Sequence, residues 1–143
     1  MSSYHNLLHV IRARICQNRD LPHSTYNAGS NQDNQVKNRT ALIFVLELIL
    51  HQHRTQHATI FNPLMGKSAL HHLIFMKTHW LPSDIRKLTL EEALFVIQEE
   101  LRIDNLSADA QAVIQELNLP SISYQTDDLT EADWDYMGNS VFL

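Results

Sequence analysis

Glycine is scarce in this sequence: three of 143 residues are glycine, against a usual share of about 7%. Valine is also uncommon, with six residues beside twenty leucines. Short strands joined by tight turns need glycine and favour β-branched side chains, whereas leucine favours helices. We therefore predict an all-α fold, with any strand limited to short pieces near 58–61 or 121–125. The length suits a single helical domain, residues 1–143, forming a compact bundle of five to seven helices with little or no β structure.

Cysteine is nearly absent as well. The single Cys16 excludes an internal disulfide and the zinc sites that are built from pairs of cysteines. The first residues lack the basic end and apolar run of a signal peptide. The longest apolar stretch, 41–50, contains Glu47 and has about half the length that a membrane-spanning helix needs. We therefore expect a cytoplasmic protein that does not enter a membrane.

No complete catalytic or cofactor-binding pattern occurs. Gly66-Lys67-Ser68 matches the end of a phosphate-binding loop, but Phe61 stands where that loop needs its first glycine. Without the glycines, too few backbone N–H groups can converge on a phosphate. No spacing joins Ser, His and Asp into a nucleophilic triad, and the default for Cys16 is an inert, half-buried thiol. The sequence gives no cofactor and favours a non-enzymatic protein.

Capping and breaking signals divide the chain into helices. Ser2 or Ser3 precedes an apolar stripe that predicts a helix to about Arg19, and the polar stretch 20–32 has the composition of a mobile loop. The remaining predicted helices run from about Ser30 to His53 or His57, from Asn62 to about His79, after a capping box at Thr89–Glu92, from Ser107 to Pro120, and from Thr130 to Gly138.

The second of these helices is apolar all round between 41 and 50, except at Glu47. A helix without a polar face is normally surrounded by other elements. Since a small domain has few elements to surround it, we expect a homodimer whose interface includes this helix. The apolar side chains that need covering are Leu42, Phe44, Val45, Leu48 and Ile49.

Charge is divided between the two halves of the chain. Residues 1–80 carry eight of the eleven Lys and Arg and three of the sixteen acids, whereas residues 81–143 carry thirteen acids and three basic residues. A basic first half suggests a nucleic-acid-binding regulator as an alternative function. The candidate contacts are Arg12, Arg14, Arg19, Lys37 and Arg39. A basic face that pairs with the acidic half of its own or a sister chain explains the same residues.

Histidines at helical spacing suggest a second alternative, a metal-dependent enzyme. His5 and His9 are four residues apart in the first helix, and His53 and His57 are four apart in the second, so each pair can face one ion. A metal site needs further ligands, and no His-Glu-x-x-His pattern supplies them. Packing explains His53 and His57 equally well, because they continue the apolar stripe of their helix.

The acidic, aromatic tail at 127–143 is the strongest candidate for partner binding. Acids interleaved with large aromatic side chains are typical of segments that dock onto a basic, grooved surface. The predicted contact residues are Asp128, Asp133, Trp134, Asp135, Tyr136 and Phe142. That surface belongs to the chain's own N-terminal half, to a sister subunit or to a foreign protein. The first hypothesis is therefore a non-enzymatic accessory or regulatory protein that acts through protein–protein interaction.

Overall fold

The computed structural model describes residues 3–21, 31–125 and 128–143. These residues form helices and no strand, which confirms the predicted all-α fold. Most of the predicted mobile loop at 20–32 lies outside the described residues, as does Asp127 at the start of the tail. The helices are α1 (Ser3–Asn18), α2 (Asn31–His57), α3 (Lys67–Thr78), α4 (Pro82–Ile85), α5 (Leu90–Val96), α6 (Ala108–Gln115) and α7 (Tyr136–Asn139), with shorter 3-10 helices η1 (Ile103–Asn105), η3 (Glu131–Asp133) and η4 (Ser140–Phe142).

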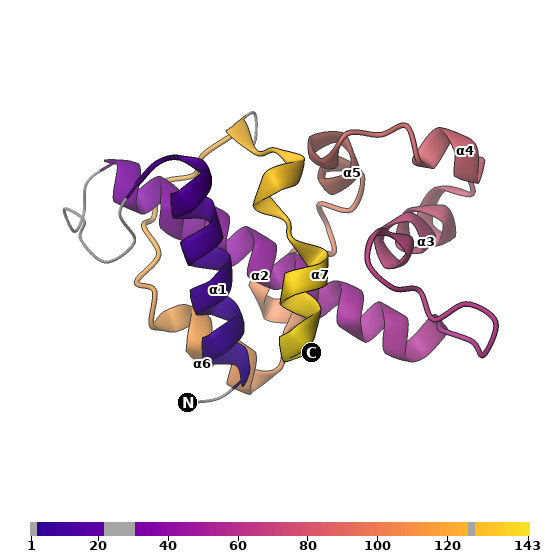
Figure 1. The fold of residues 1–143 in the computed structure, drawn as a ribbon, viewed down its shortest axis with the longest axis horizontal. Helices are drawn as coiled ribbons and strands as arrows, with labels where there is room; N and C mark the ends of the chain where they lie inside the picture. The colour runs from indigo at the N-terminus through magenta and orange to yellow at the C-terminus, as the bar shows by residue number, and fades with distance from the viewer. Residues whose placement is uncertain (1–2, 22–30, 126–127) are drawn as a thin grey trace.

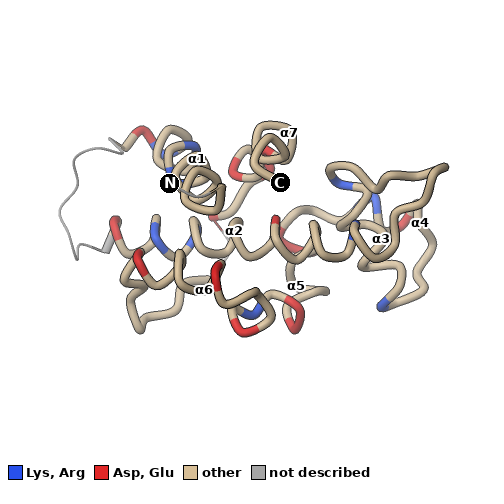
Figure 2. The backbone as a smooth tube through the Cα atoms, turned by 90° about the horizontal axis from the view of Figure 1, so that it is seen from below, with Lys and Arg blue, Asp and Glu red and all other residues tan. Residues whose placement is uncertain are grey.

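Helix α2 is the axis of the molecule, and the other helices are arranged around it (Figure 1). In the view from below, α1 and α7 lie on one side of α2, whereas α5 and α6 lie on the other (Figure 2). Helices α3 and α4 lie at the C-terminal end of α2, away from both chain termini (Figure 1). Helix α1 contacts both α2 and α7, so the two ends of the sequence meet on one side of the axis.

The apolar run of α2 is covered by its own chain. Phe44, Val45, Leu48 and Ile49 are all buried, and Leu42 is half-buried. Burying one such side chain contributes about 1.5–3 kcal/mol. The exposed apolar surface that motivated a homodimer is therefore absent from this helix, and the dimer stays a prediction without that support. No helix in the described ranges is long and apolar enough to cross a membrane.

Local capping signals place several helices correctly. Thr89 and Glu92 form the predicted capping box at the start of α5: the Glu92 N–H donates to the Thr89 hydroxyl at 3.1 Å, and the Thr89 N–H donates to the Glu92 carboxylate at 2.8 Å. The Ser107 hydroxyl accepts from the Ala110 N–H at the start of α6. These caps satisfy backbone donors that have no partner within the helix.

Two predicted helix boundaries are wrong. The third helix begins at Lys67 and not at Asn62, because Leu64 and Gly66 have positive φ angles of 54° and 57°. Leu64 is buried and its carbonyl accepts a hydrogen bond from Arg54, so a tertiary contact holds this backbone outside the helix. The last predicted helix, from Thr130, is interrupted where Trp134 adopts φ −115° and ψ 88°, a conformation that turns its side chain into the core.

Candidate functional site

The basic residues predicted as a nucleic-acid surface all form ion pairs inside the chain. Their nitrogen-to-carboxylate distances lie between 2.8 and 3.3 Å. The pairs are Arg12–Asp33, Lys37–Asp33, Arg14–Asp135, Arg19–Asp128, Arg19–Asp133 and Arg39–Asp128. A phosphate backbone would have to compete with these carboxylates for every one of the predicted contacts. The nucleic-acid alternative stays a prediction, and its proposed contact residues are already ion-paired within the chain.

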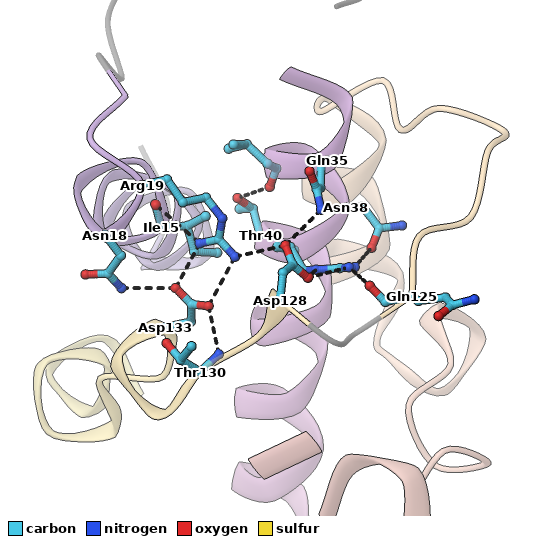
Figure 3. A network of polar contacts seen from close by, with 12 residues as sticks. Ile15, Asn18, Arg19, Gln35, Asn38, Thr40, Gln125, Asp128, Thr130 and Asp133 are labelled. Carbon is cyan, nitrogen blue, oxygen red and sulfur yellow. Dashed lines mark hydrogen bonds and ion pairs between the residues drawn. The ribbon is translucent and has the colours of Figure 1, made fainter. Parts of the chain in front are cut away.

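A network of these pairs fastens the tail to the first two helices (Figure 3). Arg39, only 1% exposed, donates to Asp128 through Nε and Nη2 at 3.0 and 2.8 Å, and also to the Gln125 carbonyl. Arg19 donates to both carboxylate oxygens of Asp133 at 2.9 and 3.2 Å. Charge-assisted bonds of this kind are about twice as strong as neutral ones. The network therefore holds residues 128–133 against α1 and α2.

The aromatic residues of the tail pack on the same surface. Trp134 is buried at 3% exposure, and its ring meets Tyr136 edge-on at 5.2 Å between centroids. Tyr136 and Phe142 are partly buried against the core, while Asp135 caps α7 by accepting from the Gly138 N–H. The sequence left three surfaces open for the tail. In the described structure the tail packs against the N-terminal half of its own chain. Binding of a foreign basic surface by these residues stays a prediction.

Glu47 lies beneath this tail with 2% exposure. Burial is the main influence on its carboxyl group and raises its pKa, while contacts with Trp134 and Asn139 and the charge of Arg54 lower it. Neither Oε2 of Glu47 nor Nε1 of Trp134 has a hydrogen-bond partner of normal geometry among the described residues. The Glu47 carboxyl group is therefore protonated more readily than an exposed glutamate.

Of the two predicted histidine pairs, the second forms a cluster. His53 and His57 lie 4.4 Å apart between ring centroids, and His72 of α3 joins them, with its Nδ1 at 2.8 Å from Nε2 of His53. Burial and the neighbouring histidines lower the pKa of His53 to about 4. In the first pair, His5 contacts Glu116 at 2.7 Å and His9 is exposed. Nowhere in the described ranges do three His, Cys, Asp or Glu side chains converge in a way that could hold a metal ion.

Exposed apolar side chains gather around the C-terminal end of α2. We call this region, residues 51–88, the distal end: the last turns of α2, the loop 58–66, α3 and α4. It holds six of the eleven large apolar side chains that are exposed in the described residues: Ile60, Phe61, Met65, Met76, Trp80 and Leu81. Large apolar side chains that are exposed together at one end of a molecule are candidates for an interaction site.

The loop 58–66 holds two of these side chains in water on a hydrogen-bonded turn. Ile60 and Phe61 are 92% and 93% exposed. The backbones of Thr59 and Asn62 bond to each other in both directions, at 2.9 and 3.2 Å, and the Thr59 hydroxyl accepts from the Phe61 N–H. The turn thus fixes the backbone that carries the exposed Ile60 and Phe61.

A hollow of about 380 Å³ lies beside this turn, between the loop, α3 and α4. Its polar lining is Asn62, Ser68, His71, His72 and Arg86, and its apolar lining is Leu64, Phe75, Pro82 and Ile85. The pKa of His71 is lowered, first by burial and then by the positive charges of Lys67 and Arg86. Hydrogen-bond donors and positive charge therefore meet an apolar wall at this place.

A wider groove runs along α5, with a volume of about 960 Å³. Its walls are mainly apolar, with Leu42, Trp80 and Phe95 among them, and Glu91 and Glu92 contribute carboxylates. Trp80 belongs both to this groove and to the exposed surface of the distal end. Trp80 thus links the distal end to this groove.

Sequence reasoning missed the distal end. We read 58–61 as a potential short strand, whereas Ala58-Thr59-Ile60-Phe61-Asn62-Pro63 forms a turn. The available signal was the pair of large apolar residues directly before Asn-Pro, a dipeptide that marks turns. Apolar residues in a turn have no core face to occupy, so this position was a candidate for an exposed contact.

No family model matches the chain, and neither a curated protein nor a solved structure is found to be similar to it.

Proposed function

We propose that this is a non-enzymatic accessory or regulatory protein that acts by binding another protein through its distal end. The observation that carries the proposal is the exposure of Ile60 and Phe61 on a turn that is hydrogen-bonded in both directions. Holding two large apolar side chains in water costs about 25 cal/mol for each Å² of apolar surface. A partner that covers them recovers this free energy, and aromatic side chains are common binding anchors.

The distal end supports this role better than the acidic tail does. Asp133 and Trp134 are buried, and Asp128 and Asp135 are ion-paired with arginines of the same chain. A basic partner would have to break these contacts before it could use the tail. The apolar side chains of the distal end need no such rearrangement.

Site-specific photo-crosslinking in the source cell tests the proposal. A photoreactive phenylalanine analogue at position 61 is expected to give one or a few crosslinked protein adducts. The matched control is the same analogue at Met137, which is exposed at 74% and belongs to α7. Adducts at position 61 that do not exceed those at position 137 would contradict the proposal.

A further inference from the structure

We infer that the hollow between the loop 58–66, α3 and α4 binds a carboxylate of the partner, so that the partner presents an acidic segment with apolar neighbours. This inference rests on the proposed function and names the chemistry of the partner at the same surface. It differs from the basic partner that the sequence of the tail predicts.

The side chains that line the hollow are suited to a carboxylate. Asn62, Ser68, His71 and Arg86 supply hydrogen-bond donors from the loop, from α3 and from the residue that follows α4. A guanidinium can donate two parallel bonds to a carboxylate, which makes arginine the side chain best matched to this group. Arg86 is exposed and forms no ion pair with any described residue. Its donors are therefore available to a partner.

Charge at the distal end favours an acidic partner. Residues 51–88 contain five Lys and Arg and one acid, Asp84, although the whole chain has a net charge of −5. The basic positions are seen around α3 and α4 in Figure 2. Lys67 and Lys77 are paired with Glu131 and Glu100. The three others, Arg54, Arg86 and Lys87, have no carboxylate partner among the described residues, in contrast to the paired basic residues of α1 and of the first turns of α2.

The apolar part of the lining favours an acidic protein segment over a nucleic acid. Leu64, Phe75 and Ile85 form one wall of the hollow, and Ile60 and Phe61 project beside it. Phosphate backbones are bound by stripes of several Lys and Arg, and three unpaired cations are few for that purpose. An Asp or Glu side chain, or a chain terminus, beside a leucine or phenylalanine matches both kinds of lining.

Binding of defined peptides to the full chain tests the inference. Three fluorescent peptides of one length share the same Phe and Leu positions, and their remaining positions are Asp and Glu, Asn and Gln, or Lys. Fluorescence anisotropy is expected to give an affinity for the acidic peptide at least about tenfold higher than for the amide peptide. Arg86→Glu should remove this preference without changing the affinity for the amide peptide. Arg102→Glu is the matched control, because Arg102 is exposed and paired with Glu99 outside the hollow.

The possible results separate this inference from the proposed function. Equal affinities for the three peptides, or an unchanged preference in Arg86→Glu, would overturn the carboxylate site. If Phe61→Ser then still weakens all three peptides, apolar docking at the distal end survives. Absence of binding by every peptide also overturns the inference, while crosslinking at position 61 tests the proposed function independently. A labelled single-stranded oligonucleotide that binds more tightly than the acidic peptide, and is lost in Arg86→Glu, would assign the hollow to nucleic acid instead.

Discussion

Glu47 lies in the middle of α2, where Trp134 and Asn139 of the tail cover it and Arg54 and Asp135 are the charged groups that act on it. Its pKa is raised above the ordinary value of 4.5, chiefly by burial. The folded chain therefore keeps a proton on this group at pH values where the unfolded chain has released it. Stability is complete below the unfolded pKa and falls as pH rises through the folded pKa.

Glu47→Gln is therefore expected to stabilise the protein at alkaline pH. Glutamine has nearly the same shape and stays neutral, so the variant should melt at a higher temperature than the parent at about pH 8, with the difference disappearing near about pH 4. Thermal melts followed by circular dichroism across this range provide the measurement. Glu91→Gln, which removes an exposed carboxylate, is the control. A melting difference that does not depend on pH would contradict the burial argument.

His53 has the opposite pH dependence. Its pKa falls from the ordinary 6.5 to about 4 because of burial and the nearby His57 and His72. The unfolded chain therefore takes up a proton that the folded chain refuses, and stability is lost as pH falls from about 6.5 to about 4. His53→Gln should flatten this part of the curve of unfolding free energy against pH, while losing about 1 kcal/mol at neutral pH with the His72 hydrogen bond.

Urea unfolding at a series of pH values measures the effect. The exposed His9, replaced by glutamine, serves as the control and should leave the acid slope as it is in the parent. Equal acid slopes in His53→Gln and the parent would mean that the cluster does not resist protonation.

At the scale of the elements, Asp128 joins the tail to two helices. It accepts from Arg19 of α1 and from Arg39 and Gln35 of α2. Removing one partner of a buried ion pair typically lowers the free energy of unfolding by about 3–5 kcal/mol. Because Asp128 is itself partly exposed, we expect Asp128→Asn to lower it by about 2–3 kcal/mol. Equilibrium urea unfolding measures this loss, and Asp104→Asn, at an exposed position of η1, should change stability by less than about 0.5 kcal/mol. A loss as small as that of the control would mean that the network does not hold the tail.

Local signals predicted those parts of the fold that local bonds determine. The capping box at Thr89–Glu92 and the cap at Ser107 each satisfy donors within four residues, so a single stretch of sequence contains the whole interaction. The start of α3 could not be predicted in this way. It depends on a hydrogen bond between Arg54 and the Leu64 carbonyl, which joins two segments across the turn.

The candidate sites also show which features local sequence predicts and which depend on contacts between distant segments. The sequence indicated an excess of basic residues in one half and acidic residues in the other, and the ion pairs of the tail follow that division. It could not indicate which basic residues stay unpaired, because this depends on where residues 128–135 cross α1 and α2. Arg14 is ion-paired with Asp135, whereas Arg86 forms no ion pair with a described residue, although both are arginines.

For the whole molecule, the side chains proposed for binding differ from those that form the core. The tail completes the core on one side of α2, whereas Ile60 and Phe61 contribute almost nothing to it because they are exposed by more than 90%. We therefore expect the double variant Ile60→Ser, Phe61→Ser to keep the parent's unfolding free energy within about 0.5 kcal/mol and to lose partner crosslinking from a photoreactive group placed at the neighbouring Met65.

A chain that ends at Asp127 should instead lose stability. Deleting 128–143 removes the buried Trp134, exposes Glu47 and leaves Arg19 and Arg39 without their carboxylates. Losing one buried aromatic side chain costs about 3–5 kcal/mol, which alone is a large share of the 5–15 kcal/mol that stabilises a typical domain. We expect this truncated chain to lose the sharp thermal transition and the dispersed amide spectrum of the parent. If the truncated chain instead keeps the parent's melting temperature, the tail is no part of the core.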